Sequence, residues 1–282
     1  MNVQWYPGHM TKAKRQMQED IKLIDLIIEL VDARVPLSSR NPDIDELGKN
    51  KARMILLNKA DLADERQNRA WMEYFKEKGI YAVSIDSRNK GSMKAVSVAI
   101  TEACKEKTER DRRRGIKNRP VRAMVAGIPN VGKSTFINTF AGKACAKTGN
   151  KPGVTKGKQW IRLSDGMELL DTPGTLWSKF EDQNVAQNLF FIGSISDNVV
   201  DRQEGGLNLL DRLKVVAPDA LIKRYGLSED DLRDGELLDK ICLKRGCILK
   251  GEPDRERCAA ALIDDFRKGR LGRISLEAPE DL

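Results

Sequence analysis

The sequence GIPNVGKS, at Gly127–Ser134, sharply narrows the possible folds of this chain. It follows the apolar run Val121–Ala126 and precedes a segment with helical spacing, which is the strand, loop and helix order of a phosphate-binding loop. Such loops occur in parallel sheets that are covered by helices on both faces. The sequence therefore predicts an α/β domain with a mostly parallel sheet.

The same loop supplies most of the predicted phosphate ligands. Its backbone N–H groups surround the phosphates, the Lys133 ammonium reaches the outer two, and the Ser134 hydroxyl is a ligand for Mg²⁺. Because Lys133 offsets charge during phosphoryl transfer, we also predict a catalytic role for it. The predicted nucleotide-binding residues here are Asn130, Val131, Gly132, Lys133, Ser134 and Thr135.

Two further segments are predicted to complete the phosphate site. The first segment is Asp171-Thr172-Pro173-Gly174, which follows a strand. At this place we expect the Asp171 carboxylate to face Mg²⁺ through water and the Gly174 N–H to face the γ-phosphate. The polar loop Lys147–Lys158 offers Thr155 as a catalytic residue and second Mg²⁺ hydroxyl, with Thr148 as the rival. A plain surface loop is the alternative.

A second motif predicts which base the site reads. Asn58-Lys59-Ala60-Asp61 follows the apolar strand Arg53–Leu57. An ionised Asp61 accepts from both N–H groups on the guanine edge, whereas adenine offers no such pair. We expect Asn58 to brace the loop and Lys59 to lie along the base. Ser84 and Ile85, at the end of the next strand, are the candidates for a backbone N–H that binds the guanine carbonyl oxygen.

The order of these motifs is unusual. In an ordinary GTPase the phosphate loop precedes the base-reading motif, whereas here Asn58–Asp61 precedes Gly127–Ser134. Because all these loops lie at the carboxyl edge of one parallel sheet, the site survives a circular permutation. With Trp5–Met10 near the start, Asp32–Pro36 after the first strand and a helical C-terminal region, the chain resembles the circularly permuted GTPases of the YlqF/RbgA type, which are bacterial ribosome-assembly factors.

That resemblance implies a function that composition alone cannot show. It implies a GTPase that binds GTP and GDP with Mg²⁺ and couples hydrolysis to late maturation of the large (50S) ribosomal subunit and to its own release. The implied partner is the large-subunit precursor, through its rRNA and ribosomal proteins. A GTP-dependent ribosome-binding switch with negligible turnover of its own is the alternative. An RNA-binding scaffold with a vestigial pocket is a third hypothesis, which the intact Asp61, Lys133 and Asp171 disfavour.

The chain divides into two predicted domains. Residues 1–177 alternate helical segments with short apolar runs, as a circularly permuted GTPase domain requires. Residues 178–282 show helical periodicity without strand runs and are predicted to form an all-α domain that contacts the ribosome or RNA. We expect the end of the chain, Leu276–Leu282, to be frayed. The predicted elements of the first domain are helices at Thr11–Leu23, Pro42–Leu47, Asp64–Lys78 and Ser92–Lys107, strands at Leu26–Val31, Arg53–Leu57, Ile80–Ile85 and Val121–Ala126, and a hairpin of Gln159–Leu163 with Met167–Leu170.

The charge distribution indicates where RNA would bind. The formal net charge is +8, and residues 1–177 hold 33 basic and 21 acidic side chains against 17 and 21 in the remainder. The basic stretch Arg110–Arg122 has Asp111 as its only acid, so we expect it to bind the phosphate backbone of RNA. A second candidate is the late cluster of Arg267, Lys268, Arg270 and Arg273, and solvated helix faces are the ordinary alternative for both.

Other features bear on compartment and assembly. No apolar run approaches the roughly 20 residues that a membrane span needs. The start of the chain has no basic segment followed by an apolar one, so we expect a cytoplasmic protein. We also expect it to be a monomer. The five cysteines are expected to be reduced thiols.

The roles of four residues stay open at this stage. The residue after the γ-phosphate loop is Thr175, where many GTPases carry a glutamine that positions the attacking water. His9, the chain's only histidine, is therefore a candidate for that catalytic role. Alternatively, His9 is a residue at the start of a helix or a contact with RNA. Asn130 matches GTPases in which an amide oxygen helps to hold K⁺, or it stabilises the loop. Asp32 and Arg34 either fasten the nucleotide-side loops or face the partner.

Overall fold

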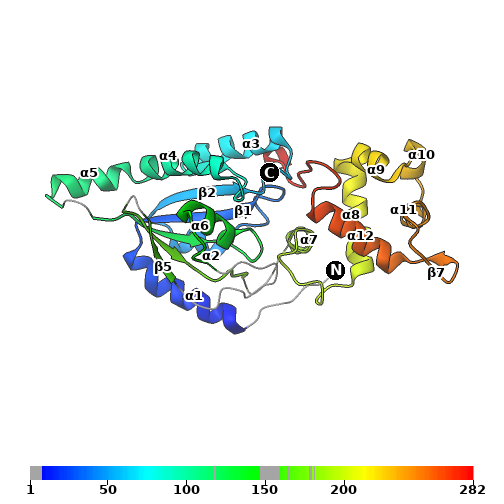
Figure 1. The fold of residues 1–282 in the computed structure, drawn as a ribbon, viewed down its shortest axis with the longest axis horizontal. Coiled ribbons are helices and arrows are strands. Elements are labelled where there is room, and N and C mark those ends of the chain that lie inside the picture. Colours follow the sequence, from blue (N-terminus) through cyan, green and yellow to red (C-terminus); the bar gives the residue numbers. More distant parts are fainter. Residues whose placement is uncertain are drawn as a thin grey trace.

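The computed structural model describes residues 8–116, 119–146, 159–163, 166–177, 180 and 182–281, without the side chains of residues 8–10, 13 and 281. Its centre is a six-stranded sheet in the order β3-β2-β1-β4-β6-β5 (Figure 1). All neighbours are parallel except β5 and β6, which form the predicted antiparallel hairpin. The strands are β1 (Leu26–Asp32), β2 (Ala52–Asn58), β3 (Tyr81–Ser84), β4 (Arg122–Ala126), β5 (Gln159–Arg162) and β6 (Glu168–Asp171).

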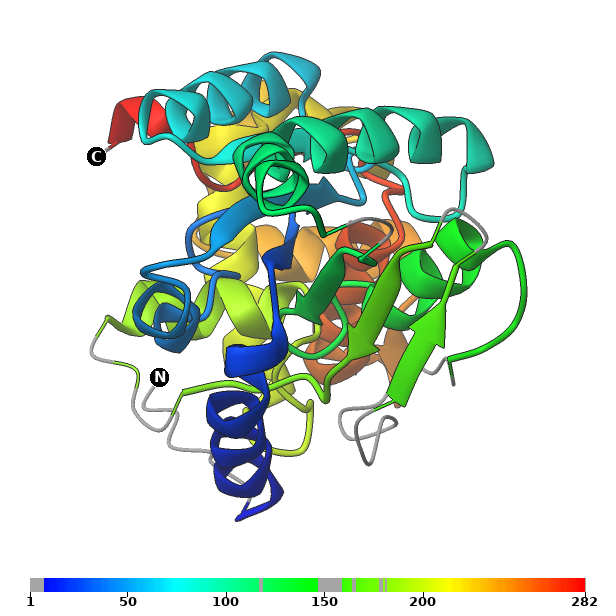
Figure 2. The ribbon, with the colours of Figure 1, turned by 90° about the vertical axis from the view of Figure 1, so that its left-hand side faces the viewer.

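Helices cover both faces of this sheet, because β1 is buried along its whole length and its side chains alternate between the faces. Ile27 packs with Met17 of α1 on one face, and Ile28 packs in a cluster with Val96 of α4 on the other. Figure 2 shows α1 below the sheet and α4 above it. The helices of this region are α1 (Gly8–Asp20), η1 (Ile21–Leu23), α2 (Pro42–Leu47), α3 (Glu65–Glu77), η2 (Lys90–Ser92), α4 (Met93–Ala103), α5 (Lys105–Arg113) and α6 (Lys133–Ala141).

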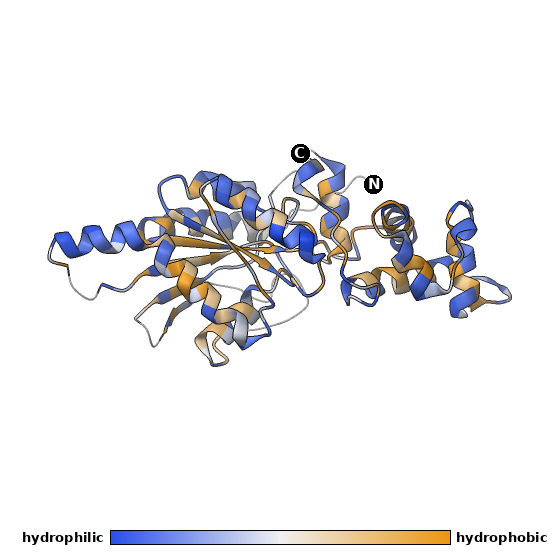
Figure 3. Cartoon of the chain, turned by 90° about the horizontal axis from the view of Figure 1, so that it is seen from above, coloured by the Kyte–Doolittle hydropathy of each residue, from blue (hydrophilic) through white to orange (hydrophobic). Residues whose placement is uncertain are grey.

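The basic stretch Arg110–Arg122 begins within a helix. The predicted helix Ser92–Lys107 extends as α5 to Arg113, after a break at Cys104. In Figures 1 and 3 this helix projects from the left end of the molecule and is almost entirely hydrophilic. None of the helices in the described part of the chain is long and apolar enough to cross a membrane.

From Gln183 onward the chain is mostly helical, as predicted. We call residues 183–267 the helical half, and its elements from α8 (Arg202–Val216) to α12 (Arg255–Arg267) lie at the right end of Figure 1. Its two longest helices, α8 and α12, pack so closely that a Cβ added at Gly206 would lie 2.4 Å from the Cβ of Ala259. The hairpin β7–β8 escaped prediction because each strand has only two residues. The elements are α7 (Gln183–Phe191), α8 (Arg202–Val216), α9 (Pro218–Tyr225), α10 (Glu229–Leu232), α11 (Leu237–Arg245), β7 (Ile248–Leu249), β8 (Glu252–Pro253), α12 (Arg255–Arg267) and η3 (Pro279–Asp281). The domain boundary at residue 178 stays a prediction.

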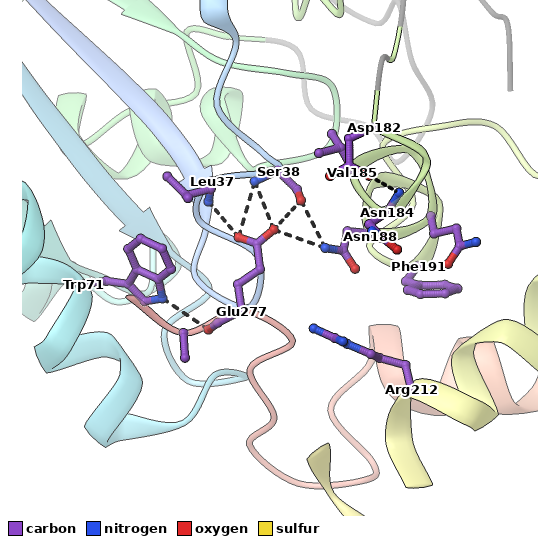
Figure 4. A pocket seen from close by; sticks show the side chains of 12 residues that line it. Leu37, Ser38, Trp71, Asp182, Asn184, Val185, Asn188, Phe191, Arg212 and Glu277 are labelled. Carbon is purple, nitrogen blue, oxygen red and sulfur yellow. Dashed lines mark hydrogen bonds between the residues drawn. The ribbon is translucent and has the colours of Figure 1, made fainter. Parts of the chain in front are cut away.

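The end of the chain returns to the sheet region, so the prediction of a frayed terminus is wrong for Leu276 and Glu277. Leu276 is 1% exposed, and its N–H donates to the Arg34 carbonyl at 2.8 Å. The Glu277 carboxylate accepts from the Leu37 N–H at 2.8 Å and from the Asn188 side chain of α7 at 3.1 Å. Figure 4 shows the bonds of the Glu277 carboxylate beside a cavity of about 330 Å³, which residues of the sheet region and of α7 line together. We call residues 269–277 the C-terminal strap.

Candidate nucleotide-binding site

The predicted base-reading and phosphate loops meet at the carboxyl edge of the sheet. Asn58, the last residue of β2, donates from Nδ2 to the Val131 carbonyl at 2.6 Å. Its Oδ1 accepts from the Ser87 N–H, in the loop after β3, at 2.9 Å. One buried amide therefore connects three loops that lie far apart in the sequence.

Two glycines of the phosphate loop are required by this close packing. Gly132 has φ +96°, and a Cβ there would lie 2.3 Å from Nδ2 of Asn58. Gly127 has φ +146°, and a Cβ there would lie 2.5 Å from the Leu30 carbonyl oxygen. Larger residues would both strain the backbone and push the loops apart.

Lys133 and Asp171 are two buried groups of opposite charge at the phosphate loop, close enough to attract each other. The Lys133 ammonium donates to the carbonyls of Gly127 and Ile128 at 3.0 and 2.8 Å. Burial raises the pKa of Asp171 and lowers that of Lys133, and their mutual attraction opposes both shifts. A Cβ at Gly174 would lie 2.8 Å from the Lys133 nitrogen, so the predicted γ-phosphate loop lies directly against this lysine.

The residues near Lys133 fit a magnesium ion. Oδ1 of Asp171 is buried and has no hydrogen-bond partner among the described residues, so it could bind a hard cation or accept from the water of one. Ser134 and Thr135, in the first turn of α6, are half-buried. Thr155 and its rival Thr148 lie outside the described residues, so the second predicted Mg²⁺ hydroxyl is not tested. The described ranges contain no group of three or more His, Cys, Asp or Glu side chains that could hold a metal ion.

The base-reading loop presents Asp61 at the surface. Its side chain is 35% exposed, and Oδ2 pairs with the Arg88 guanidinium at 2.6 Å. Arg88 is held in place by Asp86, whose Oδ1 accepts from Nε at 2.9 Å. A guanidinium presents adjacent N–H donors, as the guanine edge does, so guanine would compete with Arg88 for this carboxylate. Sequence reasoning missed Arg88, although its place just after β3 at the carboxyl edge was an available signal.

Lys59 forms an ion pair with Asp32, the last residue of β1. It has φ +59°, and its ammonium donates to Oδ2 of Asp32 at 3.0 Å. Burial alone would raise the pKa of Asp32, but Arg34 and Lys59 outweigh it and hold that pKa far below its ordinary value. Arg34 is 1% exposed and donates to the Phe266 carbonyl at 3.2 Å. Of the two roles considered for Asp32 and Arg34, the structure favours fastening the loops, because neither side chain reaches the surface.

One predicted base contact needs correction. The Ile85 N–H donates to the Leu57 carbonyl at 2.9 Å as part of the sheet, which contradicts its assignment to guanine. The Ile85 carbonyl accepts from the Ala60 N–H at 3.0 Å, so Ile85 supports the base-reading loop instead. Ser84 ends β3, and its contact with guanine stays a prediction.

The phosphate loop is also attached to the start of the helical half. Asn130 has φ +63° and donates from Nδ2 to the Gly193 carbonyl at 2.6 Å, and the Ser194 hydroxyl donates to the Pro129 carbonyl at 2.7 Å. The first bond fixes the Asn130 amide, while the proposed K⁺ contact stays untested. Thr175 is 4% exposed and accepts from the Asn41 side chain at 3.2 Å. His9 belongs to α1, but its side chain lies outside the described residues.

This fold and site define a P-loop GTPase in which the base-reading motif precedes the phosphate loop. Residues 122–221 match a family model described as 50S ribosome-binding GTPase. The chain is 47% identical to ribosome biogenesis GTPase A of Bacillus cereus, over all of this chain and 95% of that relative. It is 46% identical to the Priestia megaterium protein of the same name, over all of this chain and 98% of the relative. The chain belongs to the ribosome biogenesis GTPase A family.

A solved structure supports the same assignment. GNP-bound YlqF from T. maritima superposes with a TM-score of 0.68 at 29% identity, covering 96% of this chain and all of that one. The resemblance noted from the permuted motifs is therefore confirmed, as is the predicted α/β fold with C-terminal helices.

Proposed function

We propose that this GTPase binds a late precursor of the large ribosomal subunit in the cytoplasm, as a single chain, and that GTP hydrolysis times its release. The Asn58 bond to Val131 carries the proposal, because it holds the base-reading and phosphate loops in one site. Membership of a family described by 50S binding supports the choice of partner.

The chemistry is in-line attack of water on the γ-phosphate. Lys133 offsets the charge of the transition state, and Gly174 offers its N–H to the same phosphate. Bound Mg²⁺, held by Ser134 and through water by Asp171, would neutralise charge on the phosphate oxygens. Thr175 is buried against Asn41 and does not supply a water-positioning side chain, so we assign that role to His9.

We further propose that turnover is slow in the absence of the partner, because the phosphate site is closed. Lys133 is bonded to the carbonyls of its own loop, and Gly174 lies against it, so the phosphate site must open to admit the γ-phosphate. This observation also favours a second candidate function, a nucleotide-dependent binding switch whose own turnover is negligible. The two functions differ in whether the ribosomal partner stimulates hydrolysis.

The deciding experiment measures phosphate release from GTP with purified large subunits, with small subunits as the control. We expect the large subunit to raise turnover at least tenfold, about 1.4 kcal/mol in the barrier, and the small subunit to leave it unchanged. Binding of large subunits without any increase in turnover would favour the switch. If large subunits neither bind nor stimulate, the proposed partner is wrong.

The two candidate RNA-binding clusters differ in how their charges are paired. In the late cluster Arg267 pairs with Asp197, Lys268 and Arg270 pair with Asp264, and Arg273 donates to the base-reading loop, so these charges serve internal contacts. On α5, Arg110 and Arg112 are exposed and have no ion-pair partner in the described part of the chain, and Arg114 just beyond it shares this environment. We therefore propose α5 as the surface for rRNA phosphates.

Replacing Arg110, Arg112 and Arg114 together by alanine should weaken binding to large subunits. Each lost phosphate contact lowers the slope of log affinity against log salt by about 1, so we expect a slope lower by up to about 3. Sedimentation at several salt concentrations measures this slope. The matched triple lysine variant keeps the charge and should retain most of the binding. Equal slopes for the alanine variant and the unmodified protein would show that α5 does not bind phosphates.

A further inference from the structure

The outer side of the base-reading loop is held by the C-terminal strap. The Arg273 guanidinium donates from Nε to the Ala63 carbonyl at 2.7 Å and from Nη2 to the Ala60 carbonyl at 3.2 Å. The next residue, Ile274, donates its N–H to the Leu62 carbonyl at 2.9 Å. Three carbonyls of one short loop are thus bonded to a segment about 210 residues away in the sequence.

These bonds hold the backbone on both sides of Asp61. Ala60 and Ala63 lie on either side of it along the chain, and a planar guanidinium that binds both carbonyls fixes the turn between them. On its inner side the loop is held by the Ala60 N–H bond to Ile85. Within the described part of the chain the Asp61 side chain pairs only with the exposed Arg88, so its direction depends on this backbone.

The strap also connects the loop to the helical half. It follows α12 directly, and the Arg212 side chain of α8 donates to the Leu276 carbonyl at 2.6 Å. Glu277 accepts from Asn188 of α7 at 3.1 Å, as Figure 4 shows. A displacement of the helical half would therefore act on the strap and, through Arg273, on the base-reading loop.

We propose that Arg273 is a positioning residue for guanine recognition, and that the strap makes guanine affinity depend on the placement of the helical half. The inference rests on the proposed reading of guanine by Asp61. Because guanine makes two bonds to that carboxylate and hypoxanthine, which lacks the 2-amino group, makes one, a misplaced Asp61 penalises GDP more than IDP. The ratio of GDP to IDP affinity therefore reports the position of Asp61.

The test compares this ratio, by isothermal titration of the full chain, in Arg273→Ala, Arg273→Lys and the control Arg270→Ala. Arg270 belongs to the strap and is 44% exposed against 45% for Arg273, but among the described residues its side chain pairs with Asp264 and Asp265 of α12 and not with the base-reading loop. We expect Arg273→Ala to weaken GDP binding about fivefold and IDP binding less, so that the ratio falls. Lysine can satisfy one carbonyl and should restore part of the ratio, and Arg270→Ala should match the unmodified protein.

A purely structural role predicts a different outcome. In that case Arg273→Ala would lower the melting temperature while the GDP to IDP ratio stays that of the unmodified protein, and this result would overturn the proposal. Should Arg273→Ala fail to fold, Ser275→Ala provides the same readout, because its hydroxyl accepts from the Asp64 N–H at 3.1 Å at the end of the loop. An unmodified protein that binds GDP and IDP equally would instead refute base reading by Asp61.

Discussion

Asp61→Asn should exchange guanine for xanthine as the preferred base. The ionised carboxylate accepts from both N–H groups of guanine, whereas an amide presents one acceptor and a donor that faces the 2-amino group of the base. Loss of two charge-assisted hydrogen bonds weakens GDP binding about 100-fold or more. Xanthine has a carbonyl at that position, which accepts from the new amide, so XDP should bind the variant more tightly than GDP.

Titration of GDP and XDP into both proteins checks this exchange. Asp86→Asn is the matched control, because it changes a neighbouring carboxylate that binds Arg88 but is not assigned to the base. The control should keep its preference for GDP. A variant Asp61→Asn that still prefers GDP over XDP would show that this carboxylate does not read the base.

Lys133→Ala should abolish most GTP hydrolysis. The lysine is 8% exposed, lies beside the buried Asp171 and is the only cation that the described phosphate loop places among its carbonyls. Removal of one preorganised donor to a developing charge lowers kcat by about 10²- to 10³-fold. We expect a loss in this range for hydrolysis stimulated by large subunits.

Stimulated phosphate release measures the effect, with Lys143→Ala as the control. Lys143 lies just after α6, is exposed and has no ion-pair partner in the described part of the chain, so its loss should leave turnover unchanged. Because alanine at residue 133 leaves Asp171 buried beside an apolar group, circular dichroism should first establish that the variant is folded. A folded variant with normal turnover would remove Lys133 from the mechanism.

Local sequence patterns predicted the sheet and the position of the phosphate loop, because each depends on neighbours in the chain. The apolar runs that became β1, β2 and β4 are buried on both faces, and GIPNVGKS has the spacing of a strand-to-helix turn. The hairpin β5–β6 was likewise predicted from its short polar turn.

Contacts between distant segments were not predictable in this way. Arg273 shares a polar, charged environment with its neighbours in the sequence, and nothing local indicates that it bonds to Ala60 and Ala63. The position of Leu276 near the end of the chain is typical of a frayed terminus, yet the residue is buried and bonded to the backbone of Arg34. The Ile85 assignment failed because strand pattern gives no register, and the register determines which N–H groups the sheet uses.

A crystal structure of the chain with GDP and Mg²⁺ tests the central claim most directly. We expect the guanine edge within hydrogen-bond distance of both Asp61 oxygens, with Arg88 displaced, while the β-phosphate lies against the N–H groups of Gly132 and Lys133. A nucleotide whose phosphates occupy that loop while its base lies away from Asp61, with the Arg88 pair intact, would contradict a single site built from the two permuted motifs.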